Sequence, residues 1–363
     1  MKSETSSDQC SKAHKPNYAV PLMSDIREIE WNGYNVVSTF AGCGGSSTGY
    51  RMAGFRVLWA NEFIEIARDT YALNCSDRTV IDGRDIRDIK SAEIKSAIGG
   101  ARIDVLDGSP PCSSFSTAGK VDKGWGKQTQ YSGTKQRTDD LFFEFARILN
   151  ELQPRAFVAE NVAGLIKGKS KGYFKEIFRA LSDCGYNVKV KLLDAQWLGV
   201  PQMRRRLIFI GTRNDLELMP EHPSPLPYRY TIADVLPSVA KRGAAVDYHV
   251  EDKTDLEGYA HGIEYDRLRI GESSKLMFEL IRANPHRPVP CITATGGYGA
   301  APVHPYERRR FAIHELKLLC GFPSDFELTG AYKEQWERLG RSVPPVMMSK
   351  IAAKVAQTLS AAR

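Results

Sequence analysis

A cysteine and a glutamate stand out as a pair that could activate an aromatic ring. Cys112 follows two prolines in the segment GSPPCSSFS, and Glu160 follows an apolar run in AFVAENV. Proline fixes the dihedral φ, so Pro110 and Pro111 set the direction of the backbone in advance. A thiolate adds readily to a conjugated ring carbon, and a carboxylic acid beside it can protonate or hydrogen-bond a ring nitrogen.

A second interpretation of Cys112 is a small buried hydrophobe, which is the commoner role of a lone cysteine. The paired prolines and the matching acid favour the nucleophile. The following loop also carries basic residues, which favour the thiolate form of a nearby cysteine. These residues are Lys120, Lys123, Lys127, Lys135 and Arg137.

The segment FAGCGG, residues 40–45, is typical of a loop that cradles a nucleotide. Glycines let backbone amides approach a ligand closely. The pattern G-x-G-x-x-G fails, because counting from Gly42 places Ser47 where the third glycine belongs, and this disfavours a nicotinamide dehydrogenase. Glu62 ends the next predicted strand and could accept both ribose hydroxyls, while Asp85 could accept from an adenine amine. Either acid alone could equally be a solvated carboxylate at a strand end.

Short apolar segments precede these polar motifs. The pattern predicts strands over 34–40, 56–60, 103–106 and 156–159, with helices over 64–73 and over LFFEFARILNELQP. Strands that alternate with helices predict an α/β fold with a doubly wound, mostly parallel sheet. Ligands bind at the carboxyl ends of the strands in such sheets, so the glycine loop, Cys112 and Glu160 should meet at one edge.

Composition excludes several classes of protein. The seven widely spaced cysteines include no C-x-x-C pair, which fits neither a disulfide framework nor a zinc site, and we expect no metal. No apolar run approaches the roughly 20 residues that span a bilayer, and the polar start lacks a signal-peptide core. We therefore expect a cytoplasmic protein. The net charge of +7 agrees with a polyanionic partner, although many proteins with such a charge bind no nucleic acid.

The pattern of apolar residues and prolines changes near residue 214. Periodicity weakens there, and five prolines follow, at Pro220, Pro223, Pro225, Pro227 and Pro237. Helical spacing returns near the end, in VMMSKIAAKVAQTLSAA. We expect a flexible tail over 1–30, a catalytic and cofactor-binding domain over 31–213 and 335–363, and a smaller loop-rich domain over 214–334.

Ten segments in order, spread over most of residues 35–360, resemble the motifs of the DNA (cytosine-5)-methyltransferase family, of the bacterial or phage modification type. FAGCGG, NEF and RDI resemble its cofactor motifs, and GSPPCSSFS resembles its catalytic motif. LFFEFARIL resembles the next helix, ENVAGL the glutamate motif, and PQMRRRLIFIG the Gln-x-Arg-x-Arg motif. ITATGG, RRFAIHELKLLCGFP and RLGRSVPPVMMSKIA resemble segments that close a target-recognition region and return to the large domain.

The resemblance implies a Rossmann-like enzyme that uses S-adenosylmethionine and extrudes a cytosine from double-stranded DNA. By analogy, Cys112 attacks C6, Glu160 holds or protonates N3 and receives the exocyclic amine, and C5 takes the methyl group before losing its proton. Arg204 and Arg206 match the arginines expected to bind cytosine O2 and the nearby backbone, with Gln202 in support. Residues 113–138 would close over the base, and residues 214–334 would recognise the target.

The resemblance also implies the cofactor-binding residues. They are Phe40, Gly42, Gly44, Glu62, Phe63, Asp85, Ile86, Leu141, Arg341 and Ser342. We further expect a monomer that associates with the nucleoid when bound to DNA. Two rival functions are an RNA cytosine methyltransferase, although the Cys-Phe-Thr tripeptide usual in that branch is absent, and an inactive DNA-binding homologue, although Cys112, Glu160 and the arginines are all present.

Three positions depart from the family pattern. Ser113 stands where many members have Gln or Asn, and His314 replaces a common Arg, which leaves Glu315 to find another partner. Arg341 stands where the family typically has Asn, and a guanidinium repels a sulfonium unless a carboxylate offsets it. Arg341 therefore points either to an acidic side chain or DNA phosphate, or to an extra carboxylate on the transferred group. A carboxylated S-adenosylmethionine would supply that group and give 5-carboxymethylcytosine.

Overall fold

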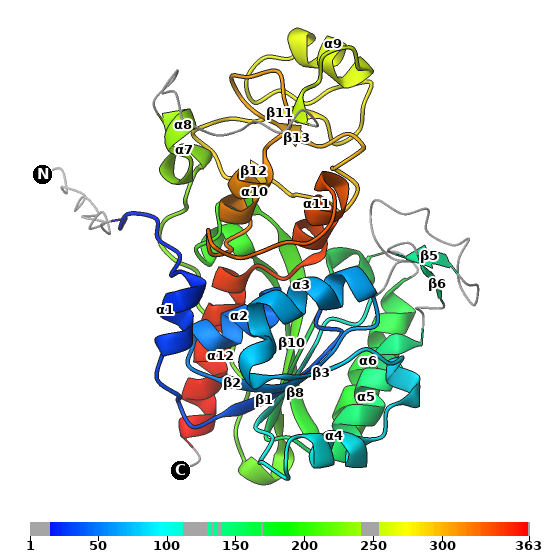
Figure 1. Cartoon of the computed structure of the whole chain (residues 1–363). Coiled ribbons are helices and arrows are strands. Elements are labelled where there is room, and N and C mark those ends of the chain that lie inside the picture. The colour runs from blue at the N-terminus through cyan, green and yellow to red at the C-terminus, as the bar shows by residue number, and fades with distance from the viewer. Residues whose placement is uncertain are drawn as a thin grey trace, which may run out of the picture.

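The structure is a computed structural model that describes residues 15–111, 129–131, 134–136, 140–167, 170–240 and 254–361 (Figure 1). Its largest unit is a seven-stranded sheet in the order β3-β2-β1-β4-β7-β10-β8. The first five strands run parallel, and β10 lies antiparallel to both of its neighbours. The predicted α/β class with a mostly parallel sheet is confirmed. The strands are β1 (Asn35–Thr39), β2 (Arg56–Asn61), β3 (Val80–Asp82), β4 (Val105–Gly108), β7 (Ala156–Val162), β8 (Tyr186–Asp194) and β10 (Arg205–Arg213).

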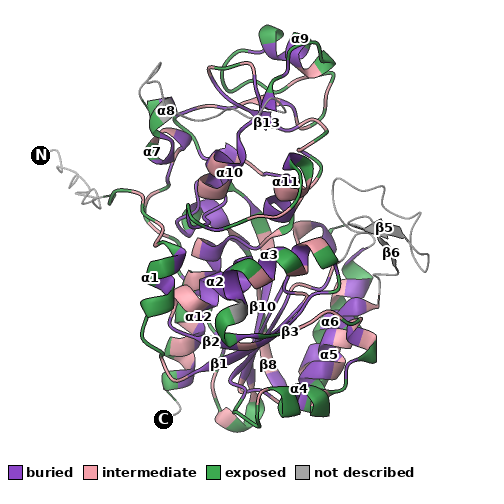
Figure 2. Ribbon diagram, viewed as in Figure 1, coloured by how far each residue is buried: buried purple, intermediate pink, exposed green. Residues whose placement is uncertain are grey.

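Helices cover both faces of the sheet, because successive strand residues are apolar on both sides (Figure 2). Val37, Leu106 and Phe157 pack in a core with α4 (Ser91–Ala97), α5 (Leu141–Leu152) and α6 (Lys171–Asp183). Val36 and Val105, one position away, pack on the other face with α2 (Gly45–Met52) and α12 (Pro345–Ser360). Helix α3 (Glu65–Cys75) packs on Ala60 at that second face. Buried on both faces, the strands hold their carboxyl ends in fixed positions.

A loop-rich region lies above the carboxyl edge of the sheet in Figure 1. Residues of this region share an apolar core that contains Ile232, Val289, Phe311 and Trp336. Its elements are α7 (Ile232–Val235), α8 (Pro237–Ala240), α9 (Ala260–Arg267), β11 (Ile281–Arg282), β12 (Val289–Pro290), β13 (Pro302–Val303), α10 (Ile313–Leu319) and α11 (Tyr332–Arg341). Strand β9 (Gln202–Met203) pairs with β12 and joins this region to the sheet domain. The expected domain division remains a proposal, and its boundary at residues 334/335 falls inside α11.

The remaining elements are short. Strands β5 (Thr129–Tyr131) and β6 (Thr134–Gln136) pair antiparallel within the segment that follows Cys112. Single 3-10 turns are η1 (Ser76–Arg78), η2 (Ile86–Asp88), η4 (Ala163–Ile166), η6 (Ala195–Trp197) and η7 (Asn214–Leu216). No helix within the described ranges has the length and apolarity needed to cross a bilayer.

The expected tail over residues 1–30 needs correction for its second half. Residues 23–28 form helix α1 (Met23–Glu28), since Met23 and Ile26 lie on one helical face and are buried in the core of the loop-rich region. Before the helix, the Tyr18 hydroxyl donates to the carbonyl oxygen of Leu318 at 3.0 Å. Lys15 forms an ion pair of 2.8 Å with Asp234. Residues 1–14 lie outside the described part of the chain.

Candidate functional site

A pocket opens at the carboxyl ends of β1, β2 and β4. Nine of the ten expected cofactor residues line it, namely Phe40, Gly42, Glu62, Phe63, Asp85, Ile86, Leu141, Arg341 and Ser342. Gly44 instead caps helix α2 beside the pocket, with a φ of 94°. The lining also includes residues that were not expected to bind the cofactor. Ser46 lies outside the quoted motifs, whereas Asn61 belongs to NEF, Ser109 and Pro111 belong to GSPPCSSFS, and Arg338 belongs to RLGRSVPPVMMSKIA. The pocket therefore brings the glycine loop together with Glu62 and Asp85. Glu160 is not among its described lining residues, and the predicted meeting of the glycine loop with Cys112 and Glu160 stays a prediction.

The glycine loop leaves space on its pocket side. Gly42 has a φ of 58°, and a Cβ built on it would meet no atom within 4 Å. Gly45 is crowded instead, because a Cβ there would lie 2.5 Å from the carbonyl oxygen of Val343. Glycine is thus required at Gly45 by the closeness of the protein and at Gly42 by its backbone conformation. The empty side of Gly42 lets a ligand approach the backbone directly.

Glu62 is bound to the glycine loop. Its two carboxylate oxygens accept from the backbone amides of Gly42 at 2.8 Å and Ile64 at 2.7 Å. Burial raises the pKa of this carboxyl, while the two amides and the charge of Arg338 act in the opposite direction. Each oxygen keeps a further lone pair, so the carboxylate can still accept from hydroxyl groups of a ligand.

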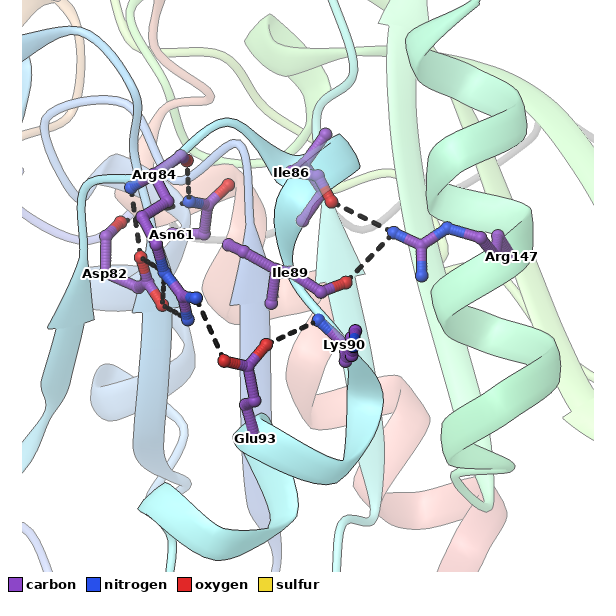
Figure 3. Close-up of polar contacts among 8 residues, drawn as sticks. All are labelled: Asn61, Asp82, Arg84, Ile86, Ile89, Lys90, Glu93 and Arg147. Atoms are coloured by element: carbon purple, nitrogen blue, oxygen red, sulfur yellow. Dashed lines mark hydrogen bonds and ion pairs between the residues drawn. The ribbon is translucent and has the colours of Figure 1, made fainter.

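A polar network holds the segment that carries Asp85 and Ile86 (Figure 3). The Asn61 amide donates to the carbonyl oxygens of Asp82 and Arg84, at 3.0 and 2.9 Å. From the other side, the Arg147 guanidinium donates to the carbonyl oxygens of Ile86 and Ile89, at 2.9 and 3.1 Å. These bonds fix both ends of the turn that presents Asp85 to the pocket.

Asp85 also shares a charged cluster. It caps the 3-10 turn η2 by accepting from the Arg87 amide at 3.0 Å, and it forms an ion pair of 2.8 Å with the Arg87 guanidinium. The same guanidinium pairs with Asp140 at 2.8 Å, immediately before helix α5. Arg87 therefore joins the Asp85 turn to Asp140, the residue directly before the pocket residue Leu141.

Glu160 lies in β7, two residues before the carboxyl end of the strand, and is 8% exposed. Arg206 on β10 approaches it from the neighbouring strand, with 2.6 Å between Arg206 Nε and Glu160 Oε1. Cys112 lies outside the described residues, as do Ser113 and most of residues 113–138. Pro111, directly before Cys112, lines the pocket. The Asn161 side-chain amide donates to the carbonyl oxygen of Pro110 at 3.3 Å. Asn161, which directly follows Glu160, therefore supports Pro110 and Pro111, called the Pro-Pro turn below.

Arg204 takes a different position from Arg206. It is 1% exposed, and its guanidinium donates to the carbonyl oxygens of Ile292 at 3.1 Å and Ser342 at 2.8 Å. Gln202 is also buried, and its side-chain oxygen accepts from the Ile292 amide at 3.2 Å. Both side chains hold the ITATGG segment against the sheet domain. The structure thus brings Arg206 to Glu160 and uses Arg204 as a bridge to the cofactor pocket, and their contacts with cytosine remain predictions.

Two of the positions affected by departures from the family pattern, Arg341 and Glu315, form ion pairs with other side chains. Arg341 lines the pocket, and its Nε lies 2.7 Å from Glu337 on the same helix. An acid partner and a place in the pocket wall thus occur together at this position. Glu315, deprived of its usual arginine, is bound by both Nη atoms of Arg309 at 2.7 and 2.9 Å. Burial opposes ionisation of Glu315, but the bonds from Arg309 lower its pKa overall.

Comparisons with known proteins agree with this arrangement. The C-5 cytosine-specific DNA methylase family matches residues 34–357. The chain is 31% identical over 334 residues to Type II methyltransferase M1.HphI of Haemophilus parahaemolyticus, covering 88% of this chain and 86% of that protein. It is 28% identical over 357 residues to Type II methyltransferase M.NgoPII of Neisseria gonorrhoeae, covering 93% and 99%. A crystal structure described as a DNA modification methyltransferase encoded within an E. coli prophage has a TM-score of 0.71 at 25% identity, covering 90% of this chain and all of that one.

Proposed function

The chain belongs to the C-5 cytosine-specific DNA methylase family, and from this membership we propose that it flips a cytosine out of double-stranded DNA and methylates C5 through a covalent bond to Cys112. It is a DNA (cytosine-5)-methyltransferase, and the family implies S-adenosylmethionine as cofactor. Residues 214–334 are proposed to recognise the target, and the enzyme is proposed to act as a monomer.

One observation carries this proposal. Pro111 lines the same pocket as Glu62 and Asp85. The residue that precedes the proposed nucleophile is therefore part of the wall of the cofactor pocket. A methyl group bound in that pocket would lie beside the base that Cys112 attacks, as transfer between two bound groups requires.

The residues present fit S-adenosylmethionine. The open face of Gly42 admits a ligand to the backbone, Glu62 offers acceptors for ribose hydroxyls, and Asp85 offers an acceptor for an adenine amine. When bound, this cofactor supplies an electrophilic methyl group. The pocket residues would hold that group at the carboxyl edge of the sheet, beside Pro111.

We propose the following sequence of bond changes. The Cys112 thiolate forms a bond to C6, while Glu160 binds N3 and the exocyclic amine. N3 takes up a proton, which the protonated form of Glu160 supplies while Arg206 remains a donor to its other oxygen. C5 thereby becomes nucleophilic and would take the methyl group, while the electron pair of the broken sulfur–methyl bond stays on sulfur and the cofactor leaves as the neutral thioether. A water or hydroxide then removes the C5 proton, and the electron pair expels Cys112 as the C5–C6 double bond returns. Glu160 recovers its proton from N3.

Covalent trapping tests this proposal. The full chain is incubated with S-adenosylmethionine and a library of duplexes that carry 5-fluorocytosine, and the products are separated under denaturing conditions. We expect a protein–DNA adduct with the native sequence and none with Cys112→Ala. Sequencing the trapped DNA gives the target site. A C5-methylated product formed by Cys112→Ala would contradict the covalent route, and adducts on RNA in preference to DNA would contradict the substrate.

A second transferred group is favoured by one observation, the place of Arg341 in the pocket wall. We propose, as the alternative, that this guanidinium binds the extra carboxylate of a carboxylated S-adenosylmethionine. Product masses after incubation with each cofactor separate the two cases. Carboxymethylcytosine that is lost in Arg341→Asn would support the alternative. Methylcytosine as the sole product, even with the carboxylated cofactor supplied, would exclude it.

A further inference from the structure

One buried carboxyl group has no role in the proposed reaction. It lies beside the pocket residue Ser46. Asp107, on strand β4, is 2% exposed. Its Oδ2 atom accepts from the Ser38 hydroxyl at 3.0 Å and from the Ser46 hydroxyl at 2.8 Å. Ser46 is in the first turn of α2 and lines the pocket. Asp107 is therefore one hydrogen bond away from the pocket wall.

The main chain of Asp107 leads directly into residues 108–116, the segment that carries Cys112 and is called the catalytic segment below. Asp107 lies opposite Ser38 on β1 and Val158 on β7, so it occupies the centre of the sheet. Its carbonyl oxygen accepts from the Thr39 hydroxyl at 3.1 Å. Gly108 follows and ends the strand, and Pro111 lies three residues further on. One residue thus holds α2 through its side chain and the start of the catalytic segment through its backbone.

The surroundings of the Asp107 carboxyl bring its pKa close to neutral pH. Burial raises the pKa of Asp107 to about 7, and the charge of Glu160 on β7 contributes in the same direction. Hydrogen bonding by Ser46 and Ser38 acts against this rise, as does Tyr50 on α2. Within the described part of the chain, no lysine or arginine forms an ion pair with Asp107.

We propose that Asp107 is a positioning residue that couples the catalytic segment to the cofactor pocket, and that the pocket accepts its cofactor when Asp107 is ionised. A carboxylate accepts both serine hydroxyls on one oxygen and fixes Ser46 in the pocket wall. A protonated carboxyl is a weaker acceptor and carries a donor of its own, so the Ser46 bond is weakened or reversed. This inference rests on the proposed function, because it assumes that the pocket binds S-adenosylmethionine.

The test measures the affinity for S-adenosylhomocysteine, the product form of the cofactor, by calorimetry on the full chain without DNA. If only the ionised form binds, the apparent Kd of the native protein falls about tenfold between pH 6 and pH 8, with a midpoint near pH 7. Asp107→Asn cannot ionise, so its profile should be flat. Comparison of the two proteins cancels any titration of the ligand itself.

A second variant separates positioning from a loss of structure. Ser38 donates to Asp107 but is not among the described residues that line the pocket. Ser38→Ala removes one donor that stabilises the carboxylate, so its midpoint should move to a higher pH with the limiting affinity at high pH retained. Asp104→Asn is the matched control. Asp104 is buried on the same chain segment, but it accepts from the Asn35 amide and pairs with Arg102 at the opposite end of the strands.

The outcomes distinguish this inference from the function on which it rests. A native profile that is flat, or an unchanged midpoint in Asp107→Asn, would overturn the role of Asp107. An equal shift of the midpoint in Asp104→Asn would also overturn it, because the effect would then not depend on the pocket. If the native protein binds no S-adenosylhomocysteine at any pH, the assignment of the cofactor fails instead.

Discussion

Glu160 and Arg206 form a buried ion pair across the antiparallel strands β7 and β10, with 2.6 Å between Arg206 Nε and Glu160 Oε1. The pair engages one oxygen of the carboxylate. We expect the other oxygen to bind the ligand, because the contact with Arg206 orients the carboxylate. An acid held by one oxygen has a defined direction for its second contact.

Changes at this pair should lower activity much more than changes next to it. Glu160→Gln removes the proton donor and should reduce kcat by about 10²- to 10⁴-fold. Arg206→Ala should reduce kcat by a similar factor, because Glu160 loses its orientation. The control is Arg205→Ala, since Arg205 is exposed and contacts Asp194. Single-turnover methylation with tritiated cofactor measures these rates, and equal losses in the Arg205 and Arg206 variants would contradict the assigned role.

The open side of Gly42 gives a test of the cofactor pocket. Gly42→Ala places a methyl group where a ligand would approach, so cofactor affinity should fall about tenfold or more. Gly99→Ala is a close control, because Gly99 has a φ of 63° and also meets no atom within 4 Å, but it lies outside the pocket. Both variants should lose similar stability in thermal melts. Calorimetric titration with S-adenosylhomocysteine should separate them, and equal affinities would place the ligand elsewhere.

Substitution of Arg204 should lower the stability of the fold more than it lowers the rate of the reaction. Arg204→Met leaves the carbonyl oxygens of Ile292 and Ser342 buried without their donor, and we expect a loss of about 3 kcal/mol in the free energy of unfolding. Arg204→Lys should recover little of this loss, because one ammonium group cannot replace a planar fork that reaches two acceptors. Urea denaturation measures both variants. A stable Arg204→Met protein that had lost only its affinity for DNA would instead support the expected contact with cytosine.

Asp107 should also affect stability in a manner that depends on pH. Its pKa is about 7 in the fold and 3.8 in the unfolded reference, so the folded chain binds more protons between these values. This group therefore makes the fold less stable as pH rises from about 4 to 7, and its contribution is constant above that range. Asp107→Asn should remove this slope. The free energy of unfolding of the variant, minus that of the native chain, should be larger at pH 8 than at pH 5. A parallel pH dependence of the two proteins would contradict the assignment.

Much of the site was predictable because its motifs follow strands directly. The glycine loop, the segment after β2 and the Pro-Pro turn all lie at the ends of apolar strands, and the sheet brings such ends together whatever the loops do. The third predicted strand was less accurate. The apolar pattern predicts it over residues 103–106, whereas β4 extends to Gly108, because Thr39 and Ala159 pair with that glycine. Partner strands, rather than local apolar character, set the end of the strand.

Contacts between distant segments could not be predicted. Tyr18 and Leu318 are 300 residues apart, and nothing in the polar N-terminal sequence indicates their hydrogen bond. Arg309 as the partner of Glu315 is close in sequence, but two neighbouring arginines offered the same charge and only the fold selects between them. The role proposed for Asp107 depends on two serines from different elements, which come together through the register of β1 and the start of α2.

The Arg204 guanidinium spans the carbonyl oxygens of Ile292 and Ser342, which belong to the loop-rich region and to the pocket wall. One rigid group therefore links the loop-rich region to the wall of the pocket. If the cofactor tightens its Ser342 end and DNA tightens its Ile292 end, each ligand raises the affinity for the other by the same factor, whichever is added first. The enzyme would then bind its target most tightly when the cofactor is already bound.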